Sequence, residues 1–291
     1  MVVIFQWQAC PPLLLVMLKE TPMKRILAGL TLASSAALMA ALTAAAPAQA
    51  APVNPVKALQ KQYKAGHGVR VSETYRTKTN GKTGIVRTTA GSLGFGKSGV
   101  VAADLRFREK GGMAGLSPSR SITVGKHTFV QGGIYSEGLP EGKKWIRYQD
   151  ASVLYTSQPL DVFDAKVLKA LVSKAKSVKG GTYRGVLTFG DVSRLYGEKI
   201  DKRLAKIKIS YALDLNAKGL VTGVRSAYTL DYGILGSTTA TANTTFTGWG
   251  AKISIKAPPS DQVVDLDELG SDTEVPQEIP NSSLDSLGGI G

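Results

Sequence analysis

Hydrophobic and polar residues alternate with a period of two along most of the chain, and this pattern constrains the fold more than any other feature. In residues 206–215, Ile207, Ile209, Tyr211 and Leu213 alternate with polar or small residues. Similar runs recur at 69–76, 83–89, 99–109, 118–124, 127–135, 143–149, 181–189, 220–232, 238–249 and 251–256. Because successive side chains of a strand point to opposite faces, these runs predict strands with one buried and one solvated face.

Short turn signals separate the predicted strands. They are Asn80-Gly81, Gly111-Gly112, Gly132-Gly133, Glu141-Gly142 and the four residues from Asn216 to Gly219. Asn and Gly tolerate the backbone angles that tight turns require. Strands joined by such short connections predict an antiparallel meander.

Two segments, residues 54–65 and residues 161–176, follow a helical period instead. Their apolar stripes are Val56, Leu59 and Tyr63 in the first segment, and Phe163, Val167, Ala170 and Leu171 in the second. Asp161 is expected to cap the second helix. One-faced helices and one-faced strands bury their apolar surfaces against each other. We therefore expect an α+β fold: a large curved antiparallel sheet, or incomplete barrel, whose concave face is covered by an N-terminal and a mid-chain helix.

After the N-terminal helix, six stretches can be compared, in this order, with known families. They are Gly133-Ile134-Tyr135, Lys143-Lys144-Trp145-Ile146, the helix core from Leu168 to Val172, Thr182-Tyr183-Arg184-Gly185-Val186, Asp214 to Leu220, and Lys252 to Pro259. Over about residues 53–268 the chain resembles the half-barrel lipid and lipoprotein carriers of bacterial envelopes, the LolA-like and LppX/LprG-like proteins of actinobacteria. The resemblance implies an apolar interior under a helical lid that holds acyl chains, and no catalysis.

The inward-facing side chains of this fold are the candidate ligand-binding residues. A curved sheet either fills its interior with side chains or leaves a cavity, and the sequence leaves both outcomes open. The candidate lining residues are Val71, Tyr75, Phe107, Ile134, Phe163, Val167, Leu171, Ile209, Tyr211 and Leu213.

An export signal stands near the start of the chain. Lys24 and Arg25 precede an apolar and small-residue run over 26–46, and the small residues Ala48 and Ala50 follow. A basic segment, an apolar helix and an Ala-x-Ala site, in that order, are typical of a signal peptide. We therefore expect an extracytoplasmic protein of the cell envelope.

The signal also divides the N-terminal region. Residues 1–22 are interpreted as an upstream extension from a mis-called start codon, and residues 23–50 as the signal peptide, cleaved between Ala50 and Ala51. A membrane anchor is the alternative for the apolar run, but Pro47 and the cleavage site interrupt the helix that an anchor needs. The single cysteine, Cys10, precedes the signal, so the mature chain has no disulfide and no lipidated cysteine such as LppX/LprG-like members usually carry.

Charge is unevenly distributed. Residues 51–260 contain 33 Lys and Arg against 13 Asp and Glu, whereas residues 261–291 contain eight acidic residues and no basic one. We expect one domain over 51–268 and a disordered acidic tail over 269–291. Outside the cytoplasm, the basic body indicates anionic envelope polymers or phospholipid headgroups rather than nucleic acid; the alternative is that the charge serves only solubility.

Motifs for catalysis or metal binding are poorly supported. Residues 91–98 match the P-loop pattern, but they lead into an alternating strand pattern and not into a helix. His67 and His127 have no second histidine or carboxylate at metal spacing, and no Gly-x-Ser-x-Gly elbow occurs. We therefore expect no enzymatic activity, no catalytic residue, no metal and no cofactor.

Three functions remain. The first is an exported, monomeric, non-catalytic protein that binds a lipid or another amphiphile in an apolar half-barrel cavity. The second is an envelope-associated interaction protein whose basic surface binds anionic cell-wall polymer or membrane. The third is a hydrolase whose site the sequence does not reveal.

The secreted form should begin at Ala51, because Ala48 and Ala50 fit the small-residue positions that signal peptidase reads. Mass spectrometry of the protein secreted by its host measures this directly. An N-terminus that retains residues 26–46 would contradict the interpretation and favour a membrane anchor.

Overall fold

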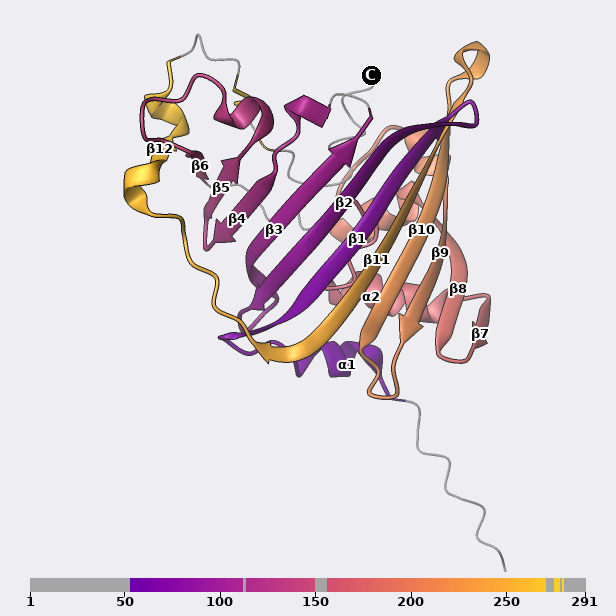
Figure 1. Cartoon of the computed structure of the whole chain (residues 1–291). Coiled ribbons are helices and arrows are strands. Elements are labelled where there is room, and N and C mark those ends of the chain that lie inside the picture. The colour runs from indigo at the N-terminus through magenta and orange to yellow at the C-terminus, as the bar shows by residue number, and fades with distance from the viewer. Residues whose placement is uncertain (1–52, 112–113, 150–155, 271–274, 278, 280–291) are drawn as a thin grey trace, which may run out of the picture. The chain divides into compact units, whose positions relative to one another are not determined.

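A single twelve-stranded sheet organises the fold (Figure 1). The structure is a computed structural model that describes residues 53–111, 114–149, 156–270, 275–277 and 279. These residues belong to one compact unit, 51–291, and everything below concerns that unit. The predicted signal peptide and most of the predicted acidic tail lie outside the described residues.

The strands pair almost entirely with antiparallel neighbours. In chain order they are β1 (His67–Thr79), β2 (Lys82–Phe95), β3 (Val100–Lys110), β4 (Arg120–Val124), β5 (His127–Gln131), β6 (Trp145–Gln149), β7 (Ser177–Lys179), β8 (Thr182–Thr188), β9 (Lys208–Leu215), β10 (Val221–Asp231), β11 (Ser237–Lys252) and β12 (Val263–Asp265). Across the sheet the order is β12-β6-β5-β4-β3-β2-β1-β11-β10-β9-β8-β7, and only β12–β6 is parallel. The sheet does not close, since β12 and β7 remain its edges.

Apart from the edge strand β12, the sheet consists of two meanders, β1–β6 and β7–β11, and β1 pairs with β11 to join them. The predicted meander is therefore present in two parts. The predicted Asn80-Gly81 turn joins β1 to β2, and both residues have positive φ, 50° and 79°, as a two-residue hairpin of this type requires.

Helices α1 (Pro55–Gln60) and α2 (Ala165–Ser173) lie on one face of the sheet, which we call the concave face (Figure 1). The predicted curved antiparallel sheet with two covering helices is thus confirmed. Both helices are shorter than predicted. Asp164 caps α2, not Asp161 as the sequence suggested, because its Oδ1 accepts hydrogen bonds from the N–H groups of Lys166 (2.7 Å) and Val167 (3.0 Å).

A third helix, α3 (Phe189–Tyr196), follows β8 and was not predicted. The sequence feature that could have predicted this helix is a capping box at its N-terminus. The Thr188 hydroxyl accepts from the N–H of Asp191 (3.0 Å), and the Asp191 carboxylate accepts from the N–H of Thr188 (2.9 Å).

The main hydrophobic core fills the space between α1, α2, α3 and the concave side of the sheet. Strand alternation supplies one half of it, for example Ile209 and Leu213 of β9, and the α2 stripe supplies the other, with Val167 and Leu171. The strands β4, β5, β6 and β12 have smaller clusters on both faces. One cluster includes Val130, Ile146, Tyr148 and Val264, and the opposite one contains Ile122, Phe129 and Trp145.

Residues 156–163, here called the crossing segment, run over the concave face before α2. The buried amide of Gln158 fixes them there. Its Nε2 donates to the carbonyl oxygen of Val224 (2.9 Å) and to the Thr244 hydroxyl (3.0 Å), and its Oε1 accepts from the Ser226 hydroxyl (2.7 Å). Because a buried amide is costly without partners, these bonds bind the segment to β10 and β11.

Asp161 occupies the far part of the crossing segment. Its Oδ1 accepts from the N–H of Phe163 (2.8 Å), and its own N–H donates to the Tyr196 hydroxyl (3.1 Å). Burial raises the pKa of Asp161 to about 6, because desolvation disfavours the charged carboxylate, and the nearby charge of Asp164 adds to the rise.

Asp161→Asn should therefore raise the free energy of unfolding at pH 7. The folded-state pKa of about 6 exceeds the ordinary value of 3.8, so the folded state binds more protons and this group's contribution to stability falls as the pH rises between those values. The difference between these two pKa values corresponds to a change of at most about 3 kcal/mol in the free energy of unfolding. Urea unfolding should show a gain in the variant that grows from near zero at pH 4 to about 1–3 kcal/mol at pH 7.

Asp201→Asn is the matched control. Hydrogen bonds from the N–H groups of Arg203 and Leu204 lower the pKa of Asp201, so its loss should bring no gain at neutral pH. A gain for Asp161→Asn that does not change with pH would contradict the assignment.

Candidate functional site

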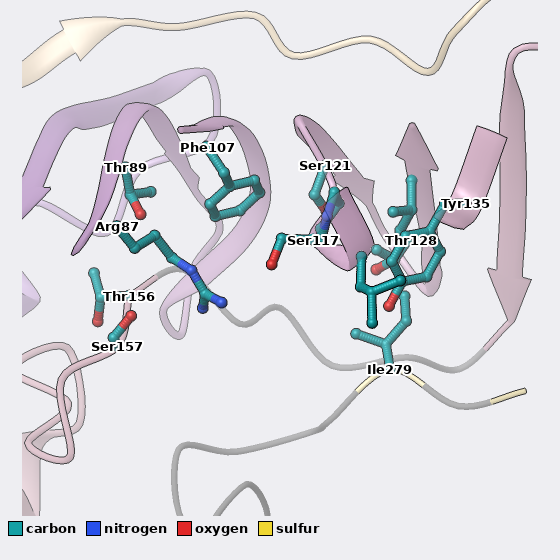
Figure 2. A pocket seen from close by; sticks show the side chains of 13 residues that line it. Arg87, Thr89, Phe107, Ser117, Ser121, Thr128, Tyr135, Thr156, Ser157 and Ile279 are labelled. Atoms are coloured by element: carbon teal, nitrogen blue, oxygen red, sulfur yellow. The ribbon is translucent and has the colours of Figure 1, made fainter. Parts of the chain in front are cut away.

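A pocket of about 240 Å³ opens on the concave face beside β2, β3, β4 and β5 (Figure 2). Its lining residues are Arg87, Thr89, Phe107, Leu116, Ser117, Pro118, Ser121, Thr128, Val130, Tyr135, Thr156, Ser157 and Ile279. Most come from four strands, from η1 (Ala114–Leu116), from η2 (Gly133–Ser136) and from the start of the crossing segment. Ser117 and Pro118 follow η1, and Ile279 comes from the C-terminal part of the chain.

Strand register places the pocket residues on one face. Thr89 of β2 lies opposite Phe107 of β3, and Ser121 of β4 lies opposite Val130 of β5. Directly opposed residues of an antiparallel pair point to the same side. The concave side of β9–β11 carries large apolar residues, whereas here three of the inward positions, Thr89, Ser121 and Thr128, have short hydroxyl side chains, which leave room for a pocket.

A guanidinium marks one end of the pocket. Arg87 pairs with Glu109 through its Nε (2.7 Å) and Nη2 (2.6 Å), both to Oε2. The Ser117 hydroxyl donates to the same oxygen (3.1 Å). These contacts hold the guanidinium in place, and Figure 2 shows it directed toward the space between Ser157 and Ser117.

Aromatic and aliphatic side chains form the opposite end, where Tyr135 and Ile279 lie near Thr128 in Figure 2. The Tyr135 ring meets the Tyr148 ring edge to face, with centroids 6.3 Å apart. Burial raises the pKa of Tyr135, so its hydroxyl stays neutral at physiological pH. The pocket is therefore polar and cationic at one end and mainly apolar at the other.

Glu73 of β1 lies close to the pocket but does not serve as a free carboxylate. It is 2 % exposed; Oε1 accepts from the N–H of Ser157 (2.7 Å) and Oε2 from the Thr244 hydroxyl (2.6 Å). Burial raises the pKa of Glu73, while these hydrogen bonds and the charge of Arg87 oppose the rise. Since both oxygens are occupied, Glu73 anchors the crossing segment at the edge of the pocket.

Most of the predicted lining residues come together in the main core. Its buried members include Val71, Phe163, Val167, Leu171, Ile209, Tyr211 and Leu213, and Tyr75 and Phe107 pack against them. Of the ten, Phe107 also lines the pocket.

Ile134 does not join this group. The strand predicted over 127–135 ends at Gln131, because Gly132 and Gly133 take positive φ and the chain turns into η2. Ile134 therefore packs against the separate cluster around Ile146.

The pocket's polar residues are not among the predicted lining residues, because those ten are all aliphatic or aromatic side chains. Arg87 and Thr89 alternate within a predicted strand and share the inward face with Phe107. An arginine on a predicted inward face is the signal that could have been read, since a buried charge requires a partner or a ligand.

The residues that match the P-loop pattern have the hairpin structure expected of them. Residues 91–98, which match the P-loop letters, lie in the β2–β3 hairpin and not at a helix N-terminus. Among the described residues, no three His, Cys, Asp or Glu side chains are grouped to hold a metal ion. No described helix is long and apolar enough to cross a membrane.

Comparison with known proteins finds similarity at the level of structure. No protein-family model matches the chain, and no curated protein matches it. Among solved structures, the crystal structure of LolA superfamily protein NE2245 from Nitrosomonas europaea is similar over 70 % of this chain and 93 % of that chain, with 12 % sequence identity and a TM-score of 0.28.

Leu213→Trp tests whether the main core or the pocket receives a ligand. Leu213 is fully buried, so the larger ring should overfill the core and lower the free energy of unfolding by about 1–3 kcal/mol without changing the uptake of a fluorescent fatty acid. Ser210→Trp, on the exposed face of the same strand, should change neither quantity. Unchanged stability with reduced uptake would instead place the ligand among the ten predicted lining residues.

Proposed function

We propose that this protein is an exported, non-catalytic carrier that holds a single-chain anionic amphiphile in the pocket beside β2–β5. The observation that carries the proposal is the pairing of one fixed guanidinium, Arg87, with a mainly apolar cavity on the same concave face. The signal-peptide pattern and the resemblance to envelope lipid carriers support an extracytoplasmic role.

The size of the pocket favours a small or single-chain ligand. Sites for drug-sized ligands typically measure about 300–1,000 Å³. At about 240 Å³, this pocket suits one acyl chain of moderate length better than a diacyl lipid. Phe107, Val130 and Tyr135 supply the apolar surface that such a chain would cover.

Arg87 is the group suited to the ligand's head. Glu109 engages its Nε and Nη2, and no described residue accepts a hydrogen bond from its Nη1. Its side chain is partly exposed, so a carboxylate or phosphate could reach it through the pocket. The neighbouring hydroxyl of Thr156 could then hydrogen-bond a further oxygen of the head.

The chemistry of the lining supports binding and not catalysis. The pocket has several serines, but its lining contains no histidine or lysine to act as a general base toward them. Ser117 already donates to Glu109, whose carboxylate is committed to Arg87. A nucleophile activated by a base and oriented by a third group is not assembled among these residues.

Ser121→Trp should abolish uptake of both a fluorescent fatty acid and its uncharged alcohol, because the ring would fill the pocket. Arg87→Gln combined with Glu109→Gln should weaken binding of the acid about tenfold, the loss of one charge-assisted contact, and leave the alcohol unaffected. The double variant avoids leaving a buried carboxylate without its partner. Fluorescence titration measures both constants.

Ser210→Trp on the convex face is the control for the added ring and should bind both probes as the parent does. The proposal fails if the parent takes up neither probe and native mass spectrometry of protein from its own host shows no bound lipid. If the double variant weakened the binding of both probes equally, Arg87 would not be the group that binds the head, and the proposal would keep only the cavity.

A further inference from the structure

The tip of the β10–β11 hairpin exposes large apolar side chains. It is formed by η4 (Gly233–Leu235) and its flanks; Ile234 is fully exposed and Leu235 is 76 % exposed. Tyr232 beside them is also exposed. In Figure 1 this hairpin extends beyond the other strands at its end of the sheet. Exposed apolar residues grouped in this way indicate an interaction surface.

Hydrogen bonds hold the tip in this conformation. The N–H of Tyr232 donates to the carbonyl oxygen of Gly236 (2.8 Å), that of Gly236 to Gly233 (2.9 Å), and that of Gly233 to the Asp231 carboxylate (2.9 Å). Asn80 of the adjacent β1–β2 turn accepts from the N–H of Ser237 (2.9 Å). The exposure of Ile234 and Leu235 is therefore imposed by an ordered turn.

Basic residues flank the tip on both sides. On one side lies the β1–β2 turn with Lys78 and Lys82, because Thr79 pairs with Thr238 of β11. On the other side lies the start of β9, which pairs with β10, and residues 198–207 lead into it from α3. Together with the tip, these segments contain seven cationic residues, Lys78, Lys82, Lys199, Lys202, Arg203, Lys206 and Lys208, against three acidic ones, Asp231, Glu198 and Asp201.

We propose that the β10–β11 tip docks on an anionic lipid bilayer, with Ile234 and Leu235 inserted among the acyl chains and the flanking lysines at the headgroups. An apolar projection surrounded by basic residues has the chemistry of a membrane-interface anchor. The apolar side chains gain by leaving water, and the cations gain from the negative surface potential.

Other occupants fit the tip less well. An anionic polymer would be attracted by the lysines but would give no reason for the exposed Ile234 and Leu235. A stable protein partner needs about 1,200–2,000 Å² of buried surface, more than three side chains on a narrow turn offer. A bilayer needs only a shallow insertion, which matches the dimensions of the tip.

Docking would also place the pocket near the membrane, although the inference does not depend on the pocket. Arg87 lies five residues along β2 from Lys82, where the β1–β2 turn ends. The cationic end of the pocket is therefore in the half of β2 nearest the docked tip.

Flotation with vesicles of phosphatidylcholine and phosphatidylglycerol at 3:1 tests the inference with the protein in the form its host secretes. The parent should float, and less so as salt rises from 0.1 M to 1 M, because screening weakens the attraction. Ile234→Asp with Leu235→Asp should lower the partition coefficient at least tenfold. Lys199→Glu with Lys202→Glu should lower it severalfold on anionic vesicles but not on phosphatidylcholine alone.

Val178→Asp is the matched control, because Val178 is also exposed, at 58 %, but lies in the β7–β8 hairpin at the opposite end of the sheet. It should float as the parent does, and so should Ser121→Trp, which separates docking from ligand uptake. A parent that does not float, or an Ile234→Asp and Leu235→Asp variant that floats equally, overturns the proposal. So does a dimeric parent that these substitutions convert to a monomer, because the tip would then bind a second copy.

Discussion

The antiparallel pairing of β1 with β11 is the interaction on which the rest of the structure depends. It runs almost the whole length of both strands and joins two meanders that would otherwise be separate sheets with exposed edges. The joined sheet offers one continuous concave face to α1 and α2. The same pairing sets Glu73 opposite Thr244, so that a carboxylate and a hydroxyl meet beneath the crossing segment.

The crossing segment gives the two halves of the concave face different properties. On the β9–β11 side, side chains such as Leu213 and Phe246 pack with the helices into a dense core. On the β2–β5 side, short hydroxyl residues leave the pocket open. Gln158 and Glu73 fix the segment between these regions through buried hydrogen bonds, which are costly to break. One part of the sheet can therefore carry a packed core while another part of the same sheet carries a pocket.

The proposed activities share one end of the sheet. The cationic end of the pocket, the apolar β10–β11 tip and the basic segment before β9 all lie toward the β1–β2 turn. Exposing the chain of an amphiphile to water as it leaves a membrane is unfavourable. A carrier that docks by its tip would shorten the distance over which the chain is exposed, which gives the arrangement a physical purpose.

The sequence by itself determined which residues form strands and which face each one buries, as in Ile209, Tyr211 and Leu213, because the direction of a side chain along a strand is a local property. It also determined the Asn80-Gly81 turn through backbone preference. Only the tertiary structure decided that β1 pairs with β11, that Gln158 anchors the crossing segment and that Arg87 faces a pocket. Those features join residues far apart in the chain, and the period of a strand carries no information about which strand becomes its neighbour.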